Sequence, residues 1–284
     1  MDEDAPVDKL EGVIIVKKGF VSIDNTPVKK VILQKSNMVK VLRNTIEEMG
    51  YKHWEADILF SNRYTIDLKK DIVEGKLKVC WIDIETARAE TFDEGYDVNK
   101  NHFPDIDDAD QVICCLTTKI NNDVQTWLCG PTPLEGVRYF RYEKDMLEDF
   151  LKYYYTECPD LISAWNLDGF DLPYLINRCM KLGLDYKRFS KTKDVWTNEF
   201  KGKKEFKTFG TIQFDLLPAY KLWRKYGNLP LLESHSLDFV ARTVVGEHKV
   251  DHGKSMSYLW KHDVKTLVEY NIQDVELLDK IDKQ

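Results

Sequence analysis

Two carboxylates in the stretch VCWIDIET, residues 79–86, suggest chemistry. Asp83 and Glu85 lie two residues apart at the end of an apolar run that reads as a buried strand. Because alternate residues of a strand point to the same face, the two acids project together, while Ile82 and Ile84 point the other way. Two anions this close repel each other unless protons or cations offset their charge. The spacing therefore indicates a cation or proton site, unless one acid caps a turn and the other is solvated.

A third acid follows the next buried segment, SAWNLDGFDLPYL. An expected strand ends at Trp165, a polar loop carries Asn166, and Asp171 lies at the start of a helix whose first turn contains Pro173. An Asp at a helix N-terminus commonly caps the helix, so an N-cap role is the alternative to a chemical one.

The fourth acid lies in the last helix, within EYNIQDVELL. Tyr270 and Asp274 are four residues apart and share one helical face, although a partly exposed helix side would show the same pattern. Oxygen ligands without His or Cys suit Mg²⁺ or Mn²⁺ rather than zinc. None of the six histidines is spaced from a cysteine as a metal ligand would be, so the histidines are assigned no chemistry.

The three segments read, in order, Asp-x-Glu, Asn-x-x-x-Phe-Asp and Tyr-x-x-x-Asp, and this order resembles the three exonuclease motifs of family B DNA polymerases. The surrounding letters DIET, WNLDGFDLPYLINR and YNIQDVELLDKI agree with those motifs. ILFSNRYTIDL resembles the segment that precedes this domain, and SHSLDFVARTVVG resembles the helix between the second and third motifs. The resemblance covers about residues 50–284, with phage and archaeal polymerases nearest in character.

The resemblance implies an α/β fold with a ribonuclease H-like mixed β-sheet flanked by helices. It also implies a four-carboxylate 3′→5′ exonuclease that uses two divalent cations, Mg²⁺ or Mn²⁺. Carried over by position, Asp83 would bridge both metals. Glu85 and Asp274 would complete the site of the nucleophile's metal, and Asp171 would serve the second metal mainly through water.

The same resemblance gives the tyrosine a role. Two such ions can clamp a scissile phosphate, one activating water and the other stabilising the leaving 3′ oxygen. Tyr270 would orient the attacking water through its hydroxyl. Histidine-type relatives place a His five residues before the last Asp, where this chain has Glu269, so the chain is similar to the tyrosine type.

Aromatic side chains near the motifs are candidates for holding a DNA end, because bases stack on aromatic rings without sequence preference. Phe92 follows the first motif in a polar loop, and Phe170 precedes Asp171, although Phe170 could equally be core. Asn166 is a candidate for bonding the terminal nucleotide, or for capping its own loop.

A basic segment, residues 187–209, carries eight Lys and Arg against three acids and alternates with aromatics. It predicts a β-hairpin that reaches toward DNA, similar to the hairpin that helps family B relatives to separate primer from template; the alternative is a solvated basic loop. Lys201, Lys203 and Lys204 are its candidate phosphate contacts, and Lys249 is a further candidate outside it.

The whole chain is acidic, with 284 residues and a formal net charge of −7. A protein that only coats nucleic acid is usually basic, so this charge argues against a coat protein but not against an enzyme with a carboxylate pocket. No run approaches about 18 apolar residues, so no membrane span is expected. The acidic start, MDEDAPVDKLEG, does not read as a signal peptide. The six cysteines show no C-x-x-C spacing, which favours reduced, buried thiols in a cytoplasmic compartment. The expected location is therefore the cytoplasm, or, given the resemblance, wherever DNA is replicated.

The elements that must position these residues fall into two regions. Residues 1–75 predict a small α+β N-terminal region of polymerase type, and residues 76–284 predict the exonuclease domain. Strands are expected within 76–85, 110–120, 123–130 and 160–166. Helices are expected within 142–159, 171–183, 217–227, 236–246 and 263–282. Strands followed by alternating helix and strand imply a mixed sheet.

The sequence contains neither an Asp-Thr-Asp palm signature nor a Ser-Leu-Tyr-Pro motif, so we expect the polymerase domain to be absent from this chain. Its partners would be single-stranded DNA 3′ ends, primer–template DNA and a polymerase domain or subunit. A piece of a larger polymerase and a separate subunit both fit, and RNA is a possible other substrate. The alternative of another class is a non-catalytic nucleic-acid-binding or polymerase-docking module. A sugar hydrolase that uses two carboxylates is a further alternative, but it would not explain the residues around the three motifs.

Overall fold

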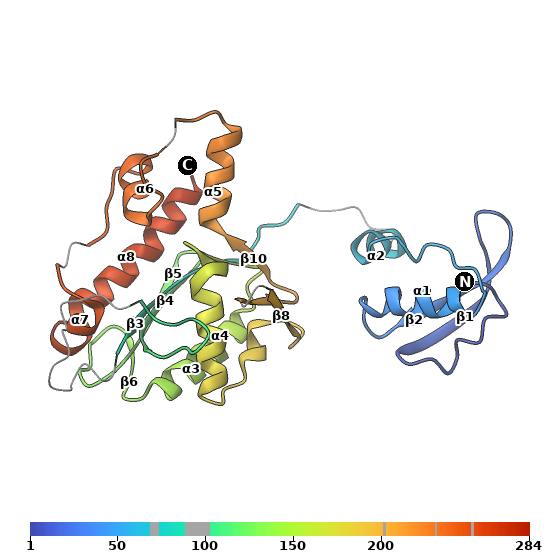
Figure 1. Ribbon diagram of the computed structural model, residues 1–284, viewed down its shortest axis with the longest axis horizontal. Coiled ribbons are helices and arrows are strands. Elements are labelled where there is room, and N and C mark those ends of the chain that lie inside the picture. Colours follow the sequence, from blue (N-terminus) through green and yellow to red (C-terminus); the bar gives the residue numbers. More distant parts are fainter. Residues whose placement is uncertain (69–73, 89–102, 201–202, 231, 251–252) are drawn as a thin grey trace. The chain divides into compact units, whose positions relative to one another are not determined.

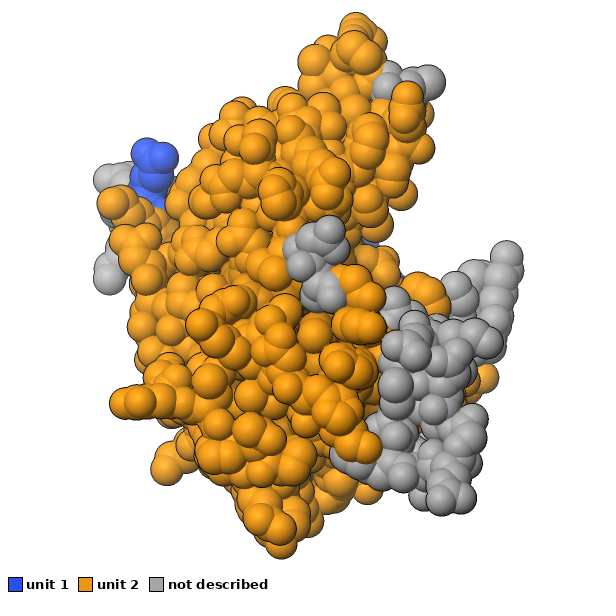
Figure 2. All heavy atoms as spheres, turned by 90° about the vertical axis from the view of Figure 1, so that its left-hand side faces the viewer, with its two compact units in different colours: residues 1–75 blue, residues 76–284 orange. Residues whose placement is uncertain are grey.

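Two units, each with its own core, divide the chain into Met1–Gly75 and Lys76–Gln284 (Figures 1 and 2). The computed structural model describes residues 1–68, 74–88, 103–200, 203–230, 232–250 and 253–284. None of the helices in these ranges combines the length and the apolar character that crossing a membrane requires.

Unit 1 is a β-hairpin with two helices. Strands β1 (Val13–Val21) and β2 (Pro27–Leu33) pair antiparallel, and the helices are α1 (Met38–Glu48) and α2 (Phe60–Leu68). Leu42 and Ile46, one helical turn apart, bury one side of α1 against Ala5 and Val7. The small core of unit 1 is thus formed by the apolar face of an amphipathic helix.

Unit 2 is built on a six-stranded mixed sheet with the order β10-β7-β3-β4-β5-β6. Strands β10, β7 and β3 run parallel, β4 is antiparallel to both β3 and β5, and β6 is parallel to β5. The strands are β3 (Val79–Ala87), β4 (Val112–Ile120), β5 (Asp123–Cys129), β6 (Arg138–Phe140), β7 (Leu161–Ala164) and β10 (Ile212–Asp215). Strands β8 (Val195–Phe200) and β9 (Lys203–Thr208) pair antiparallel and form a separate hairpin.

Helices cover both faces of this sheet (Figure 1). They are α3 (Glu143–Glu157), α4 (Leu172–Lys181), α5 (Leu216–Tyr226), α6 (Leu237–Val244), α7 (Met256–His262) and α8 (Val264–Asp282). A π-helical turn η2 (Leu167–Asp171) precedes α4, and a 3₁₀ turn η3 (Tyr186–Phe189) follows it. The expected mixed sheet flanked by helices is therefore confirmed.

The alternation of β3 assigns its residues to two different cores. Ile82 and Ile84 pack with α3 and α4 on one face of the sheet. Trp81 packs with α5, α6 and α8 on the other face, and Ala87 packs there with α7 and α8. Side chains two apart on a strand share a face, so positions 83 and 85 point toward α8.

Ion pairs fix the helices that carry the later motifs. Arg178 on α4 donates two hydrogen bonds to the Glu143 carboxylate on α3, at 2.8 and 2.6 Å, with both side chains largely buried. Lys119 on β4 pairs with Glu276 at 2.6 Å and Asp279 at 2.7 Å, both on α8. Bidentate and partly buried pairs of this kind hold geometry more firmly than exposed ones.

Some elements were not expected from the sequence. β6 and β10 are three and four residues long, and α7 is seven residues long. Segments this short show too little periodicity to stand out, and their partners decide their conformation. All six cysteines are free; five are buried and Cys158 is exposed.

Candidate active site

Strand β3 carries the first two acids to the α8 face of the sheet. Asp83 is paired in register with Thr117 of β4, and Glu85 with Cys115. The β3–β4 register is irregular between Glu85 and Thr86, so regular pairing is interrupted directly beside the second acid. Such irregularities re-aim side chains and recur next to active sites.

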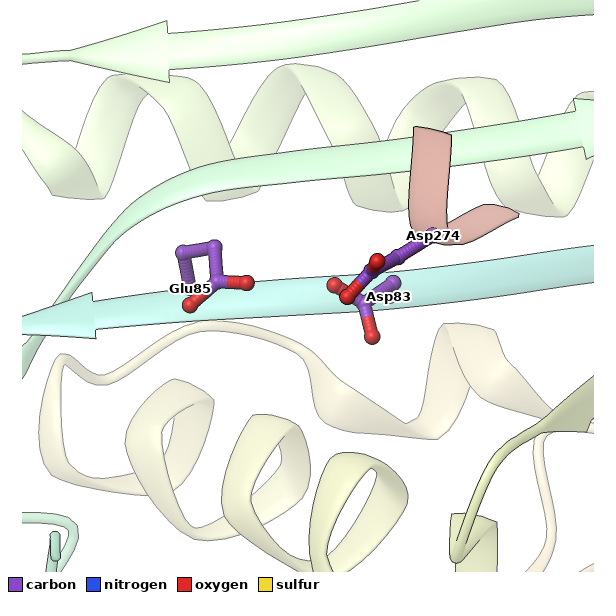
Figure 3. A group of neighbouring side chains, drawn as sticks. All are labelled: Asp83, Glu85 and Asp274. Atoms are coloured by element: carbon purple, nitrogen blue, oxygen red, sulfur yellow. The ribbon is translucent and has the colours of Figure 1, made fainter. Parts of the chain in front are cut away.

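Asp274 meets this pair from α8. A carboxylate oxygen from each of Asp83, Glu85 and Asp274 can be chosen so that all three lie within 4.8 Å of one another. Figure 3 shows Asp83 and Glu85 rising from β3 and Asp274 reaching down to the Asp83 carboxylate. Asp274 is almost fully buried, and the other two acids are partly buried. We call these three residues the carboxylate cluster.

Asp171 approaches the cluster from the turn that follows β7. It is buried at the end of η2, and its side chain makes no capping hydrogen bond to α4. The N-cap alternative for this residue is therefore wrong. Asp171 lies outside the cluster of three, yet η2 packs against β3, and burial and the charge of Asp83 both raise the pKa of Asp171.

A lysine pairs with the cluster from the loop after α6. Lys249 Nζ donates to the Tyr270 hydroxyl at 2.8 Å and forms an ion pair with Asp274. Its ammonium lies 4.8 Å from the centre of the Tyr270 ring. The loop is itself held, because the Lys249 backbone N–H donates to Asp238 on α6 at 2.9 Å. Tyr270 and Asp274 thus share one face of α8, as their spacing predicts.

The electrostatics of the site follow from gathering acids in a poorly hydrated place. Burial raises the pKa of Asp83 to about 8; the charge of Asp274 raises it too, while Lys249 and Asn271 lower it. Burial and the neighbouring acids also raise the pKa values of Glu85 and Asp171 well above their ordinary values. Burial lowers the pKa of Lys249, but Asp274, Tyr270 and Asp83 outweigh it, so the pKa rises and the ammonium stays charged.

Asp215 holds the turn that carries Asp171, and sequence reasoning did not select this residue. It is buried at the junction of β10 and α5 and accepts the backbone N–H of Leu217 at 3.1 Å as the N-cap of α5. Its two oxygens also accept the N–H groups of Asn166 at 3.1 Å and Asp168 at 3.0 Å. The only signal in the sequence is an Asp between a short apolar segment and a helix.

Asn271 is the second residue that sequence reasoning missed. Its Nδ2 donates to Asp83 Oδ2 at 2.6 Å, and its Oδ1 accepts from Cys115 Sγ at 3.5 Å. It lies inside the third motif, next to Tyr270, but nothing local indicates that its side chain reaches β3.

The loop residues proposed to hold DNA are placed beside the site. Asn166 has a left-handed backbone, φ 78°, and its carbonyl accepts the N–H groups of Gly169 and Phe170. A β-carbon at Gly169 would collide with the end of the Asn166 side chain, so a larger residue there would displace that amide. Phe170 is partly buried and packs on the core, with its ring 5.5 Å from that of Tyr174. Phe170 therefore packs on the hydrophobic core, and its stacking on a DNA base stays a prediction.

The remaining candidates are only partly described. Phe92 and Lys201 lie outside the described residues, and for Lys203 only the backbone is described, in β9. Lys204 is exposed on β9, opposite Glu199 in register. The hairpin expected in residues 187–209 is therefore present as β8 and β9.

The carboxylate cluster fits a divalent metal ion of the hard class. Every ligand it offers is a carboxylate oxygen, the set that suits Mg²⁺ or Mn²⁺. Asp83 and Asp274 raise the pKa of Glu85, so their mutual repulsion is unfavourable without added positive charge. A cation among the three acids would relieve it.

The mixed sheet, with carboxylates meeting between its central strand and a crossing helix, defines a ribonuclease H-like exonuclease fold. The profile described as "DNA polymerase family B, exonuclease domain" matches residues 34–240. This chain belongs to that family.

Curated relatives agree with the assignment. The chain is 29% identical over 286 residues to a DNA polymerase of Thermococcus aggregans, covering 95% of this chain and 14% of the relative. It is 26% identical over 264 residues to the DNA-directed DNA polymerase of Escherichia phage RB69, covering 84% of this chain and 28% of the relative. The chain thus spans less than a third of the length of these polymerases.

The role of Asp215 can be tested against a simpler N-cap. Asp215→Ala removes the acceptor of three backbone N–H groups, and hydrogen bonds to a charged group contribute about 1.5–3 kcal/mol each. We expect the free energy of unfolding in urea to fall by more than about 2 kcal/mol, with faster hydrogen exchange at Asn166 and Asp168. Asp263 caps α8 through one backbone N–H in an exposed setting, so Asp263→Ala is the control, with an expected loss of about 1 kcal/mol. Equal exchange at Asn166 in both variants would contradict the role.

The raised pKa values predict how pH and metal act on stability. The folded protein keeps protons that the unfolded chain, with carboxyl pKa values near about 4, has lost. This stabilisation is complete below about pH 4 and disappears as the pH rises toward about 8, the pKa of Asp83. In EDTA, thermal unfolding midpoints should therefore fall between about pH 6 and about pH 8.

Added Mg²⁺ should reduce this fall, because cations bind the ionised carboxylates. Asp83→Asn should flatten the dependence in EDTA. A wild-type protein whose stability in EDTA stays level or rises over this window would rule out the raised pKa values.

Proposed function

We propose that the chain is a metal-dependent 3′→5′ DNA exonuclease, the proofreading module of a family B DNA polymerase. The observation that carries the proposal is the meeting of acids from two distant segments, β3 and α8, beside Tyr270 and Lys249. Burial raises the pKa of Asp171, from a third segment, and this residue lies near enough for the charge of Asp83 to raise that pKa further. Asp83, Glu85, Asp171 and Asp274 are its metal ligands, and Tyr270 acts with them in catalysis. The reaction would release nucleoside monophosphates from single-stranded 3′ ends.

The metal chemistry fits the acids present. Two divalent cations, when bound, would polarise the scissile phosphate and supply an activated water. The carboxylates of β3 and α8 would hold one side of that site, and Asp171 the other. Because the acids come from β3, α8 and the η2 turn, their separation is set by the packing of unit 2 and not by any loop alone.

Tyr270 and Lys249 supply the groups that contact the reacting phosphate. The Tyr270 hydroxyl, already bonded to Lys249 Nζ at 2.8 Å, can turn a lone pair toward an attacking water and orient it. The Lys249 ammonium stays charged, so it can contact a non-bridging phosphate oxygen and offset the charge that develops there.

Binding of the DNA end would rest on residues beside the second motif. Asn166 offers an amide to the terminal nucleotide, and the exposed part of Phe170 offers a stacking surface. Phe92 is the second stacking candidate. Lys204, with Lys201 and Lys203, would contact the phosphate backbone from the β8–β9 hairpin, which makes the binding salt-dependent.

A digestion assay tests the activity directly. The purified full chain is given a 5′-labelled single-stranded DNA with Mg²⁺ or with EDTA, and we expect a metal-dependent ladder that shortens from the 3′ end. Asp83→Ala should slow it at least about a hundredfold, because metal ions contribute several kcal/mol to the transition state.

Asp123→Ala, at the exposed start of β5, serves as the matched acid control and should digest at the wild-type rate. An RNA of the same sequence tests the choice of sugar. A folded wild type that binds single strands tightly but cleaves nothing, even with Mn²⁺, would favour the non-catalytic binding module instead.

The hairpin has its own test. Shortening the segment between Asn198 and Lys204 should slow digestion of duplex ends and leave single-strand digestion unchanged. A stacking step is worth about 1.4 kcal/mol, so the expected loss is about tenfold for each base pair that the hairpin helps to open. Equal loss on both substrates would show that the hairpin does not separate strands.

A further inference from the structure

A row of three hydrogen-bonded side chains, two of them fully buried, joins β4, α8 and β3 at the carboxylate cluster. Asn271 and Cys115 are both fully buried. Cys115 donates its thiol to Asn271 Oδ1 at 3.5 Å, and Asn271 Nδ2 donates to Asp83 Oδ2 at 2.6 Å. The residues at the two ends of the Asn271–Asp83 bond are 188 positions apart in the sequence.

The chemistry of these groups fixes the orientation of the Asn271 amide between its two partners. A carboxylate accepts hydrogen bonds, so the amide must present its nitrogen and not its oxygen to Asp83. The amide oxygen then faces Cys115, whose thiol is a weak donor. Burial raises the pKa of Cys115 well above its ordinary value, so the thiol keeps its proton. A reversed amide would turn its oxygen to the Asp83 carboxylate, lose that bond and keep only a weak N–H contact to the sulfur.

The Asn271 amide that donates to Asp83 is neutral, so it adds no positive charge beside a site for a cation. The carboxylates of Asp83 and Asp274 lie close together in the cluster, so the repulsion between them favours rotation of the Asp83 carboxylate away from it. An ammonium in the place of Asn271 would hold Asp83 but would also repel an incoming divalent cation. An amide holds one oxygen by a hydrogen bond and adds no charge. Partners of this kind commonly orient the ligands of metal sites.

We propose that Asn271 is a positioning residue for Asp83: its amide, oriented by the Cys115 thiol, holds the Asp83 carboxylate in place to receive a divalent cation with Glu85 and Asp274. The inference deepens the proposed function and rests on it. Asn271 touches neither DNA nor the reacting phosphate in this role; it acts through Asp83.

The test measures Mn²⁺ binding to the full chain without DNA, by calorimetric titration. Asn271→Leu keeps the side-chain size and removes both hydrogen bonds. We expect Mn²⁺ affinity to fall about tenfold to a hundredfold, the usual effect of losing such a partner. In digestion assays kcat should fall and KM for single strands should change little, with partial recovery at high Mn²⁺.

Asn177→Leu is the matched control. Asn177 is a buried asparagine of α4 whose Nδ2 donates to the Ile106 carbonyl at 2.9 Å, away from the cluster. Its replacement should lower the unfolding temperature without changing Mn²⁺ affinity. If Asn271→Leu behaves in the same way, with normal Mn²⁺ binding, Asn271 is merely structural and the proposal is wrong.

Substitutions at Cys115 test this row of hydrogen bonds without touching Asn271, and they keep the proposal testable if Asn271→Leu does not fold. Cys115→Ser retains a donor and should keep near wild-type Mn²⁺ affinity, whereas Cys115→Val removes it and should weaken binding. Equal Mn²⁺ affinities in the two variants would show that the Cys115 thiol does not orient Asn271.

Because the readout is metal binding, it separates this proposal from the proposed function. A wild type that binds Mn²⁺ but cleaves no DNA would overturn the exonuclease and leave the Asn271 effect measurable. A wild type that binds no Mn²⁺ would overturn both.

Discussion

Repulsion between carboxylates is the constraint around which unit 2 is arranged. Asp83, Glu85 and Asp274 gather in a poorly hydrated place, and each charge raises the pKa of a neighbour. Partners outside the cluster hold two of these three acids in place. Lys249 pairs with Asp274, and Asn271 donates to Asp83. Repulsion of this kind is unfavourable without added positive charge, so the cluster is suited to a divalent cation.

The sheet supplies the rigidity that this constraint requires. β3 and β7 run parallel in its centre, so their carboxyl ends meet at one edge and bring the first and second motifs together. α8 crosses β3 and β4 and is tied to β4 by the Lys119 ion pairs, so the third motif cannot drift away from the first. On the opposite face of β3, Cys80, Ile82 and Ile84 pack with α3 and α4. One strand thus anchors the core on one side and the cluster on the other.

The second motif shows how backbone geometry serves the site. The π-helical turn η2 gives Asp171 a buried position against β3 in place of a capping role. Asp215 holds the start of that turn by accepting the N–H groups of Asn166 and Asp168. An unusual turn is stable here because a neighbouring strand–helix junction satisfies its free donors. The proposed DNA contacts of Asn166 and Phe170 depend on the same anchorage.

The sequence by itself determined which side chains share a face. The two-residue period of β3 places Asp83 with Glu85, and the helical period of α8 places Tyr270 with Asp274. The motif order identified the family and the mixed sheet. Only the tertiary structure decided which side chains contact one another: the Lys249 contacts, the Asn271–Asp83 bond and the hydrogen bonds of Asp215. It also decided that the short segments β6 and β10 are strands. Periodicity is local and can be read from neighbours in the chain, whereas a hydrogen bond between residues 188 positions apart depends on how whole elements pack.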